Sequence, residues 1–501
     1  MSGRCATLRP VTDVPPASRP RDPAGPAFTA DEVARITGGR LLTRSDRPIR
    51  GAAVDSRVVA DGEVFVALPG ERTDGHAFVD AAVARGASAV IVTRNPADLA
   101  SLGEVSVVRV GDALAALHAL AAAWRSRFDP LVVGVTGSIA KTSTKEAIAA
   151  VLSARLRVLK NEGNQNNEVG LPLTVLRMAP EHEAAVLEMG MYAGGEIADL
   201  AAIARPRIGV VTAIQPVHLS RMGSLDAIEQ AKGELLEALP QDGTAILNAD
   251  DARVRGMGHR TSARSVTYGF AADADVAAEG VASAGVDGMR FVLRTAAGRR
   301  AIEVPTLGRL AVHNALAGAA VGLAAGLSLD DIAAGLARGW AAPHRAQLVR
   351  AGGATIVDDS YNASPASVLA ALELVAGLPG RKVAVLGEML ELGEGHESGH
   401  RSTGEEAARV VELLIVVGRG AAAIAAGARE AGLAADRVIE VPDRDAARDA
   451  LRPRVRDGDV ILVKASRGVE LDLLVDALRT DLGGAPGPAS VGGSATGVVV
   501  S

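Results

Sequence analysis

Short apolar runs recur along the chain and alternate with longer stretches rich in Ala, Leu, Glu and Arg. The clearest runs lie at residues 89–93, 131–136, 208–214, 382–387, 413–418 and 460–466. Continuous apolar strands that alternate with helices are typical of parallel sheets covered by helices on both faces. The pattern therefore predicts an α/β protein built on parallel sheets.

Two interruptions of this pattern indicate domain boundaries. The segment SRFDP at 126–130 precedes a strong strand, and in GWAAPHR at 339–345 the helical periodicity ends next to a proline. At about 150 residues per domain, a chain of 501 residues corresponds to three domains. We therefore expect domains at residues 27–126, 127–342 and 343–482.

The two ends of the chain lack this alternation. Residues 1–26 are rich in Pro and Arg without the apolar core of a signal peptide, and residues 483–501 are mostly Gly, Ala, Ser and Val. We expect a disordered leader and a disordered tail. Residues 310–329 approach the length of a membrane span, but Ala and Gly dominate them and they contain His313 and Asn314. A buried helix of a soluble protein is the favoured interpretation, so we expect no membrane insertion and a cytoplasmic location.

Charge and cysteine content exclude several classes of protein. Lys and Arg number 53 against 59 Asp and Glu, and no basic block is present, so nucleic-acid binding is not expected. The single Cys5 excludes a disulfide framework and a cysteine-based metal site, which fits a reducing compartment. Only six of the basic residues are lysines, and a genome-wide preference for arginine explains that bias. Each remaining lysine is nevertheless a candidate for chemistry that arginine cannot perform.

Residues 131–156 read as a strand, a glycine-containing loop and a helix, which is the arrangement of a phosphate-binding loop. Gly137 would bring backbone N–H groups to phosphate, Lys141 would reach the terminal phosphates, and Thr142 or Ser143 would supply a hydroxyl to Mg²⁺. The strict pattern is not met, because Ala140 replaces the glycine before the lysine. If the loop requires a positive φ there, alanine costs about 1 kcal/mol. An ordinary strand–helix turn with an incidental Lys-Thr pair is the alternative.

Two further residues suit a nucleotide–metal site. Glu188 ends one predicted strand, and His218 follows another in the loop QPVHLS. Polar groups at the carboxyl ends of strands lie at the crevice where open α/β sheets bind ligands. Lys232 lies in a predicted helix, where a lysine is ordinarily solvated.

The segment HESGH at 396–400 matches the zinc-protease pattern H-E-x-x-H. A working site needs His396 and His400 inside one helix, whereas Gly395 and Gly399 interrupt the segment and its surroundings resemble a loop. A zinc site is therefore not expected.

Taken together, these segments resemble the Mur ligases, the ATP-dependent amide-forming enzymes of peptidoglycan precursor synthesis. The resemblance covers roughly residues 28–478 and includes the phosphate loop, the His-Asn pair at 313–314, GNQNNEVGLPLTVL, LEMGMYAGGEI and ILNADD. DDSYNASP at 358–365 and LGEMLELG at 386–393 resemble the branch that adds D-alanyl-D-alanine to UDP-muramoyl-tripeptide. The DNPR-like signature of the branch that adds the third amino acid is missing.

This resemblance implies a three-domain α/β fold: an N-terminal UDP-binding α/β domain, a central P-loop-type ATPase domain with a parallel sheet, and a C-terminal Rossmann-like domain. It also implies that ATP and Mg²⁺ take part in the reaction, and that the Lys232 amine is carbamylated by CO₂ to help hold a second Mg²⁺. The catalytic residues implied are Lys141, Glu188, His218, Lys232 and Arg345, and the metal residues are Thr142, Glu188, His218 and Lys232.

The resemblance further assigns binding residues. Asn314 would approach the adenine, Arg345 the γ-phosphate and Asp359 the ribose. The ATP-binding residues implied are Thr136, Gly137, Ser138, Ile139, Ala140, Lys141, Thr142, Ser143, Asn314, Arg345 and Asp359. Those implied for the other substrates are Ser56, Arg57, Thr73, Asp74, His76, Asn166, Asn167, Tyr361, Asn362, Lys464, Ser466 and Arg467.

The reaction implied is the ATP-dependent joining of D-alanyl-D-alanine to UDP-N-acetylmuramoyl-tripeptide through an acyl phosphate, by a protein expected to be a monomer. This is the last cytoplasmic step of UDP-muramoyl-pentapeptide synthesis. Two alternatives remain open. One is a related ligase with another amino-acid acceptor, such as a third-residue-adding or folate-type enzyme. The other is a catalytically weakened protein that binds UDP-muramyl peptides, a reading motivated by Ala140 alone.

Overall fold

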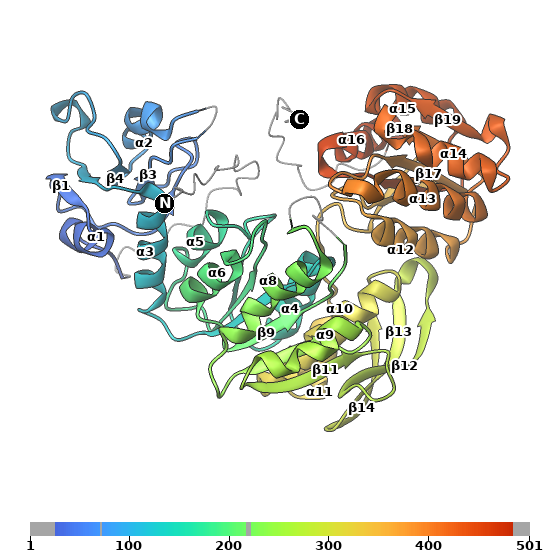
Figure 1. Cartoon of the computed structure of the whole chain (residues 1–501), viewed down its shortest axis with the longest axis horizontal. Helices are drawn as coiled ribbons and strands as arrows, with labels where there is room; N and C mark the ends of the chain where they lie inside the picture. Colours follow the sequence, from blue (N-terminus) through green and yellow to red (C-terminus); the bar gives the residue numbers. More distant parts are fainter. Residues whose placement is uncertain (1–25, 71–72, 217–221, 484–501) are drawn as a thin grey trace.

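The computed structural model describes residues 26–70, 73–216 and 222–483. Within that part of the chain, the strands form three sheets, one in each of three lobes that follow one another along the sequence (Figure 1). The N-terminal lobe is blue, the central lobe runs from cyan to yellow, and the C-terminal lobe is orange to red. The three-domain α/β architecture predicted from the sequence is confirmed.

The N-terminal lobe holds a five-stranded sheet in the order β1-β5-β4-β3-β2, in which β1 is antiparallel to β5 and the other pairs are parallel. Its strands are β1 (Arg40–Thr43), β2 (Ala52–Ala53), β3 (Val64–Val66), β4 (Ala89–Val92) and β5 (Ser106–Arg109). Its helices are α1 (Ala30–Thr37), α2 (Val79–Ala84) and α3 (Ala113–Arg125).

The central lobe holds a nine-stranded sheet in the order β14-β13-β12-β11-β10-β9-β6-β8-β7. Its strands are β6 (Leu131–Thr136), β7 (Val158–Lys160), β8 (Ala184–Glu188), β9 (Ile208–Val211), β10 (Thr244–Asn248), β11 (Arg264–Gly269), β12 (Val276–Ser283), β13 (Met289–Thr295) and β14 (Gly298–Val304). Its helices are α4 (Lys141–Leu152), α5 (Gly170–Val175), α6 (Glu196–Ala204), α8 (Leu225–Glu237), α9 (Ala252–Gly256), α10 (Arg309–Ala324) and α11 (Leu329–Ala337).

The C-terminal lobe holds a six-stranded sheet in the order β15-β16-β20-β17-β18-β19, with β15 antiparallel to β16. Its strands are β15 (Gln347–Ala351), β16 (Ala354–Asp358), β17 (Lys382–Gly387), β18 (Leu413–Val417), β19 (Val438–Val441) and β20 (Val460–Lys464). Its helices are α12 (Pro365–Ala376), α13 (His396–Val410), α14 (Ala422–Glu430), α15 (Arg444–Leu451) and α16 (Leu471–Asp481).

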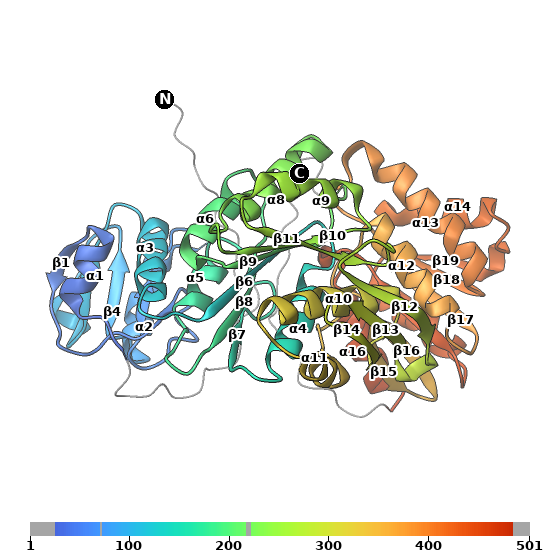
Figure 2. The same ribbon diagram turned by 90° about the horizontal axis from the view of Figure 1, so that it is seen from below.

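Alternate residues of the central strands enter different cores, which explains why these strands are apolar throughout. In β6, Val132 belongs to one buried cluster while Val133 and Val135 belong to another on the opposite face. Helices α4, α10 and α11 supply the second cluster, and they lie together in Figure 2. Because side chains alternate across a strand, a sheet covered on both faces needs apolar residues at every position.

The prediction of parallel sheets is incomplete, because β12, β13 and β14 form an antiparallel extension of the central sheet. In β13, buried Met289, Phe291 and Leu293 alternate with more exposed residues. This period-2 pattern is the signature of a strand with one covered face. A search for continuous apolar runs does not detect it.

The apolar segment at 310–329 forms α10 and the start of α11, as expected for a buried helix. Its small residues allow close packing: a Cβ added at Gly322 would lie 2.8 Å from a Val151 methyl group of α4. Across the described residues, no helix is long and apolar enough to cross a membrane.

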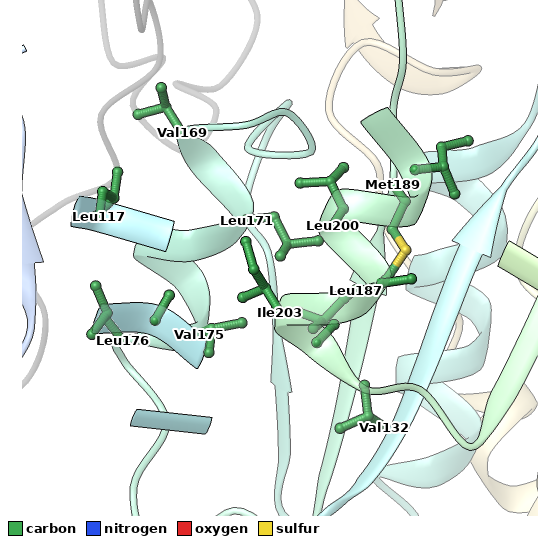
Figure 3. Packing of buried hydrophobic residues seen from close by; sticks show 14 of the residues in the cluster. Leu117, Val132, Val169, Leu171, Val175, Leu176, Leu187, Met189, Leu200 and Ile203 are labelled. Atoms are coloured by element: carbon green, nitrogen blue, oxygen red, sulfur yellow. The ribbon is translucent and has the colours of Figure 1, made fainter. Parts of the chain in front are cut away.

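The N-terminal and central lobes share a hydrophobic cluster (Figure 3). Leu117 of α3 lies in the same cluster as Leu171 of α5 and Leu200 of α6. At the predicted boundary, the Arg127 guanidinium stacks 4.1 Å from the ring centroid of Phe28. The connection between these two lobes is therefore packed rather than a loose linker.

Candidate active site

A cleft of about 630 Å³ lies between the central and C-terminal lobes. The phosphate loop and the start of α10 line it from the central lobe, and the ends of β16 and β20 line it from the C-terminal lobe. The predicted site residues that line it are Ser138, Ile139, Ala140, Lys141, Thr142, Ser143, Glu188, Asn314, Arg345, Asp359, Tyr361, Asn362, Lys464, Ser466 and Arg467.

The loop between β6 and α4 is held against the end of β9. A Cβ at Gly137 would lie 1.9 Å from Thr212 Oγ1, so only glycine fits there. Thr212 Oγ1 donates to the Ile139 carbonyl oxygen at 2.6 Å, and Ser138 Oγ donates to the Gln215 carbonyl oxygen at 3.0 Å. Ala140 adopts a φ of 62°, so the loop does require the left-handed conformation considered above.

Lys141 begins α4, and its Nζ donates to the carbonyl oxygens of Gly137 at 2.8 Å and Ser138 at 3.2 Å. Burial lowers the pKa of this lysine; the Glu188 carboxylate acts to raise it, and the Arg345 guanidinium acts to lower it. Charges from both lobes therefore converge on the Lys141 amine.

Glu188 ends β8 and is 2% exposed. Asn166 Nδ2 donates to Glu188 Oε1 at 2.6 Å, whereas Oε2 is buried without a hydrogen-bond partner among the described residues. The Glu188 peptide N–H donates to Asn161 Oδ1 at 2.9 Å. One carboxylate oxygen is thus fixed by the protein and the other is left for a ligand.

Lys232 is buried in α8 rather than solvated, with an exposure of 2%. Burial, and after it the charge of Lys141, lower the pKa of this lysine well below its usual range. Since carbamylation needs the neutral amine, this environment suits the role that the resemblance implied. His218 lies outside the described residues.

The two residues of the His-Asn pair in α10 have different surroundings: Asn314 faces the cleft, and His313 contacts the central sheet. Asn314 lines the cleft, and its Oδ1 accepts a hydrogen bond from Thr144 Oγ1 at 2.9 Å. His313 Nε2 lies 3.0 Å from Asn248 Oδ1, and its ring packs against Tyr268 with centroids 4.9 Å apart. His313 thereby attaches α10 to the end of β10.

Arg345 reaches the cleft from the segment that joins the central and C-terminal lobes. Its guanidinium lies 4.3 Å from the ring centroid of Tyr361, and that of Arg467 lies 5.5 Å from the same centroid. The preceding residue, His344, has its Nδ1 2.8 Å from Asp358 Oδ2 at the end of β16. The hydrogen bond to Asp358 raises the pKa of His344, against an opposing effect of burial.

Asp359 and Lys464 form an ion pair at 2.6 Å beside the cleft. The other Asp359 oxygen, Oδ1, accepts from the Ala346 N–H at 3.1 Å, and Lys464 Nζ also donates to the Asn362 carbonyl oxygen at 2.9 Å. Ser466 is 3% exposed, and its Oγ accepts from the Leu390 N–H at 2.9 Å. Asp359, Lys464 and Ser466 therefore shape the cleft wall as well as line it.

Several predicted binding residues lie apart from the cleft or have internal partners. The Thr136 side chain is fully buried and donates to the Met189 carbonyl oxygen at 2.9 Å, and the Thr136 carbonyl oxygen accepts from the Thr212 N–H at 2.9 Å, so both groups are engaged within the protein. Asn166 holds Glu188, and Asn167 Oδ1 accepts from the Gly170 N–H at 2.9 Å. Asn167 thus orders the start of α5.

The predicted uridine-site residues lie in the N-terminal lobe. Ser56 is buried, Thr73 is exposed, and Arg57 pairs with Asp55 at 2.6 Å. The residue pair Asp74 and His76 is bonded internally, with Asp74 Oδ1 2.6 Å from His76 Nδ1. Burial acts to raise the pKa of Asp74, but hydrogen bonds from His76 and Arg94 outweigh it and lower the pKa to about 2.

The segment HESGH is helical, which corrects the expectation of a loop. It forms the first turn of α13, where Gly399 packs closely against Pro365 and does not break the helix. His400 Nε2 accepts from the Met389 N–H at 2.8 Å, and Nδ1 lies 2.6 Å from the His396 carbonyl oxygen. Both nitrogens of His400 are therefore engaged in packing the helix.

Sequence reasoning missed Asn161 and His344. Asn161 lies just before the asparagine-rich segment 163–167, and His344 directly precedes Arg345. Their positions beside recognised motifs are the signal that could have found them. Their hydrogen-bond partners Glu188 of β8 and Asp358 of β16 are, however, distant in the sequence.

Comparison with known proteins agrees with this arrangement. Three family models match: the Mur ligase family catalytic domain at residues 48–125, the Mur ligase middle domain at 135–322, and the Mur ligase glutamate ligase domain at 344–467. The UDP-N-acetylmuramoyl-tripeptide--D-alanyl-D-alanine ligase of Bacillus subtilis is 37% identical over 90% of this chain and 98% of the relative.

Solved structures agree as well. MurF from Acinetobacter baumannii superposes with a TM-score of 0.81 at 29% identity, covering 91% of this chain and 99% of that one. MurF from Thermotoga maritima in complex with ADP gives a TM-score of 0.76 at 29% identity, covering 87% and 98%. On these matches and on the geometry of its cleft, the chain belongs to the Mur ligase family.

Proposed function

We propose that this protein is an ATP-dependent ligase that adds D-alanyl-D-alanine to UDP-N-acetylmuramoyl-tripeptide, completing the UDP-muramoyl-pentapeptide in the cytoplasm. The observation that carries the proposal is the meeting of Lys141 and Glu188 with Arg345 in one cleft between two lobes. The names of relatives that match over most of the chain support the choice of acceptor. The ADP complex of a relative supports ATP as the energy source.

The chemistry requires an activated carboxylate, because a free carboxylate does not condense with an amine in water. Transfer of the γ-phosphoryl group to the tripeptide carboxylate makes an acyl phosphate. The D-alanyl-D-alanine amine then attacks, and phosphate leaves. Phosphoryl transfer depends on positioning and charge neutralisation. Lys141, from the phosphate loop, and Arg345, from the segment between the two lobes, supply positive charge to the same cleft, and Asn314 supplies an amide for the adenine.

The residues present fit a Mg²⁺ ion. Glu188 Oε2 is a buried carboxylate oxygen without a partner in the described part of the chain, and the Thr142 hydroxyl lies on the same cleft. Oxygen ligands of this kind are those that Mg²⁺ prefers. We assign Glu188, Thr142, His218 and carbamylated Lys232 to hold magnesium. When bound, Mg²⁺ would neutralise charge on the phosphate oxygens.

The acceptor side of the cleft is formed by the C-terminal lobe. Tyr361 and Arg467 lie together there, and Asn362 is exposed beside them. A cation next to an exposed amide suits a dipeptide that carries a carboxylate and an amine. We assign Tyr361, Asn362 and Arg467 to the dipeptide. The residues assigned to the UDP sugar are Ser56, Arg57, Thr73, Asp74 and His76.

The proposal is tested by incubating the purified protein with ATP, Mg²⁺ and UDP-muramoyl-tripeptide, with D-alanyl-D-alanine or single amino acids as acceptor. Phosphate release and a product mass that includes the dipeptide are expected with D-alanyl-D-alanine, and Lys141→Ala should abolish both. Turnover with a single amino acid instead would favour the related-ligase alternative. Binding without turnover on any acceptor would favour the weakened binding protein. Size-exclusion chromatography tests the expected monomer.

Lys232→Ala tests the carbamate. The substitution should remove most activity and leave a small cavity, into which formate or acetate can place a carboxylate. Partial rescue by these anions, measured as phosphate release against anion concentration, is expected. Lys141→Ala is the matched control, because its activity should not return. Absence of rescue in Lys232→Ala would argue against a carbamate.

A further inference from the structure

Lys145 is fully buried although the proposed reaction gives it no task. It lies one helical turn after Lys141 in α4, and its Nζ donates to the Asn161 carbonyl oxygen and pairs with Glu146 at 3.1 Å. Lys160 also pairs with Glu146. Burying an ammonium group costs free energy unless the group is paired and hydrogen-bonded. The contacts of Lys145 with the Asn161 carbonyl oxygen and with Glu146 offset that cost.

Asn161 connects this lysine to Glu188. It has no exposed surface and directly follows β7, one of the two edge strands of the central sheet. Its Oδ1 accepts from the Glu188 N–H at 2.9 Å, while its Nδ2 donates to the Glu188 carbonyl oxygen at 3.1 Å and to the Gln165 carbonyl oxygen at 2.8 Å. The side-chain amide of Asn161 therefore bonds both the backbone N–H and the backbone carbonyl of Glu188.

The three residues form a continuous path from the phosphate-loop helix to the end of β8. Lys145 binds the backbone of Asn161, Asn161 binds the backbone of Glu188, and Asn166 fixes Glu188 Oε1 at 2.6 Å. Glu188 Oε2 is then the carboxylate oxygen left without a partner among the described residues. The bond from Lys145 thus ties the end of the edge strand β7 to α4.

We propose that Asn161 and Lys145 are positioning residues that hold the Glu188 carboxylate at a set place relative to Lys141. The inference rests on the proposed function, in which Glu188 binds Mg²⁺ and Lys141 binds phosphate. Groups that orient metal ligands typically change metal affinity or activity by about 10–100-fold when they are replaced. A merely structural role would lower stability without selectively affecting the metal.

The test measures ADP affinity by calorimetry, once with Mg²⁺ and once with EDTA, and takes the ratio as the gain due to the metal. The variants are Asn161→Leu, which has a similar shape without polar groups, Lys145→Met, and Glu188→Gln as reference. Thr174→Val is the matched control. Thr174 is equally buried in neighbouring α5, and its hydroxyl lies 2.9 Å from the Gly170 carbonyl oxygen and 3.5 Å from Gln165 Oε1, so it bonds neither Glu188 nor Asn161 directly.

Glu188→Gln and Asn161→Leu should each reduce the metal-dependent gain in ADP affinity about 10- to 100-fold. Lys145→Met should also reduce this gain. Their affinity for ADP in EDTA should stay at the wild-type value. Thr174→Val should keep the wild-type gain even though its melting temperature falls.

Two negative results have different meanings. If Glu188→Gln keeps the full gain, the metal assignment in the proposed function is wrong. If Glu188→Gln loses the gain while folded Asn161→Leu keeps it, only the positioning role is overturned. Should Asn161→Leu fail to fold, Lys145→Met decides, and an unchanged gain in that variant overturns the proposal.

Discussion

Ala140 carries a backbone conformation that favours glycine. With a φ of 62° at the start of α4, its Cβ is crowded by the loop backbone. Alanine keeps the backbone N–H that glycine would also supply, so its methyl group removes no donor to phosphate. Ala140 therefore affects stability more directly than it affects phosphate binding.

Ala140→Gly should stabilise the protein by about 0.5–1 kcal/mol, since relief of the left-handed strain outweighs the greater freedom of glycine in the unfolded chain. Urea unfolding measures the change. Ala150→Gly, in the helical interior of α4, is the control and should destabilise by about 1 kcal/mol. A loss of stability in Ala140→Gly would contradict the strain argument.

His344 should make stability depend on pH. Because its pKa is raised in the folded protein by the bond to Asp358, its contribution is complete below the ordinary histidine pKa and is lost as pH rises through the raised value. The difference in melting temperature between wild type and His344→Gln should therefore be larger at about pH 5.5 than at about pH 9. A difference that grows with pH would show that the neutral imidazole makes the favoured contact.

For individual residues, a position at the end of a strand could be predicted from the sequence, but the hydrogen-bond partner of the side chain could not. Glu188, at the end of β8, and Lys141, in the loop-to-helix turn after β6, line one cleft, as expected where the carboxyl ends of parallel strands meet. Asn167 and Thr136 were assigned to ligands, yet their side chains bond the protein backbone. Such partners come from other strands and loops, so neither spacing nor residue type reveals them.

Among the helices, α13 and α14 approach each other at glycines. A Cβ at Gly404 would lie 2.0 Å from the Ile424 carbonyl oxygen, and one at Gly427 would lie 2.2 Å from the Arg401 carbonyl oxygen. The backbones of the two helices are therefore in direct contact, and a methyl group at either position must push them apart.

Gly404→Ala should destabilise the C-terminal lobe by about 1–3 kcal/mol, the usual cost of overpacking. Hydrogen–deuterium exchange should rise over residues 396–430, while the peptides of the central lobe stay protected. Gly395→Ala is the control, because nothing lies within 4 Å of a Cβ built there. Equal behaviour of the two variants would contradict the close helix contact.

For whole elements, the sequence predicted continuous apolar strands better than half-covered ones. Strands β6 and β17 coincide with predicted runs, because burial on both faces leaves an uninterrupted apolar signal. The β12–β14 extension and the short β1 and β2 were missed, since alternating or two-residue strands resemble polar loops. The helix at 396–410 was missed because its glycines serve packing rather than a turn.

At the scale of the whole molecule, the lobes are joined in two different ways. The cluster around α3 contains residues of both the N-terminal and the central lobe. In contrast, the two clusters of the C-terminal lobe draw on that lobe alone except for Leu307. The first junction is apolar and continuous, and the second is a cleft lined by both polar and apolar side chains.

From this difference we expect the molecule to unfold as two units rather than three. The first two lobes cannot melt separately without exposing their common interior, whereas the third can unfold with little loss of apolar contact. Differential scanning calorimetry without ligand should resolve two transitions. An ATP analogue with Mg²⁺ should bring the melting temperatures of the two transitions closer to each other. A ligand bound by both units is released when either one unfolds, so its binding couples their stabilities. Three transitions would show that the common interior contributes little.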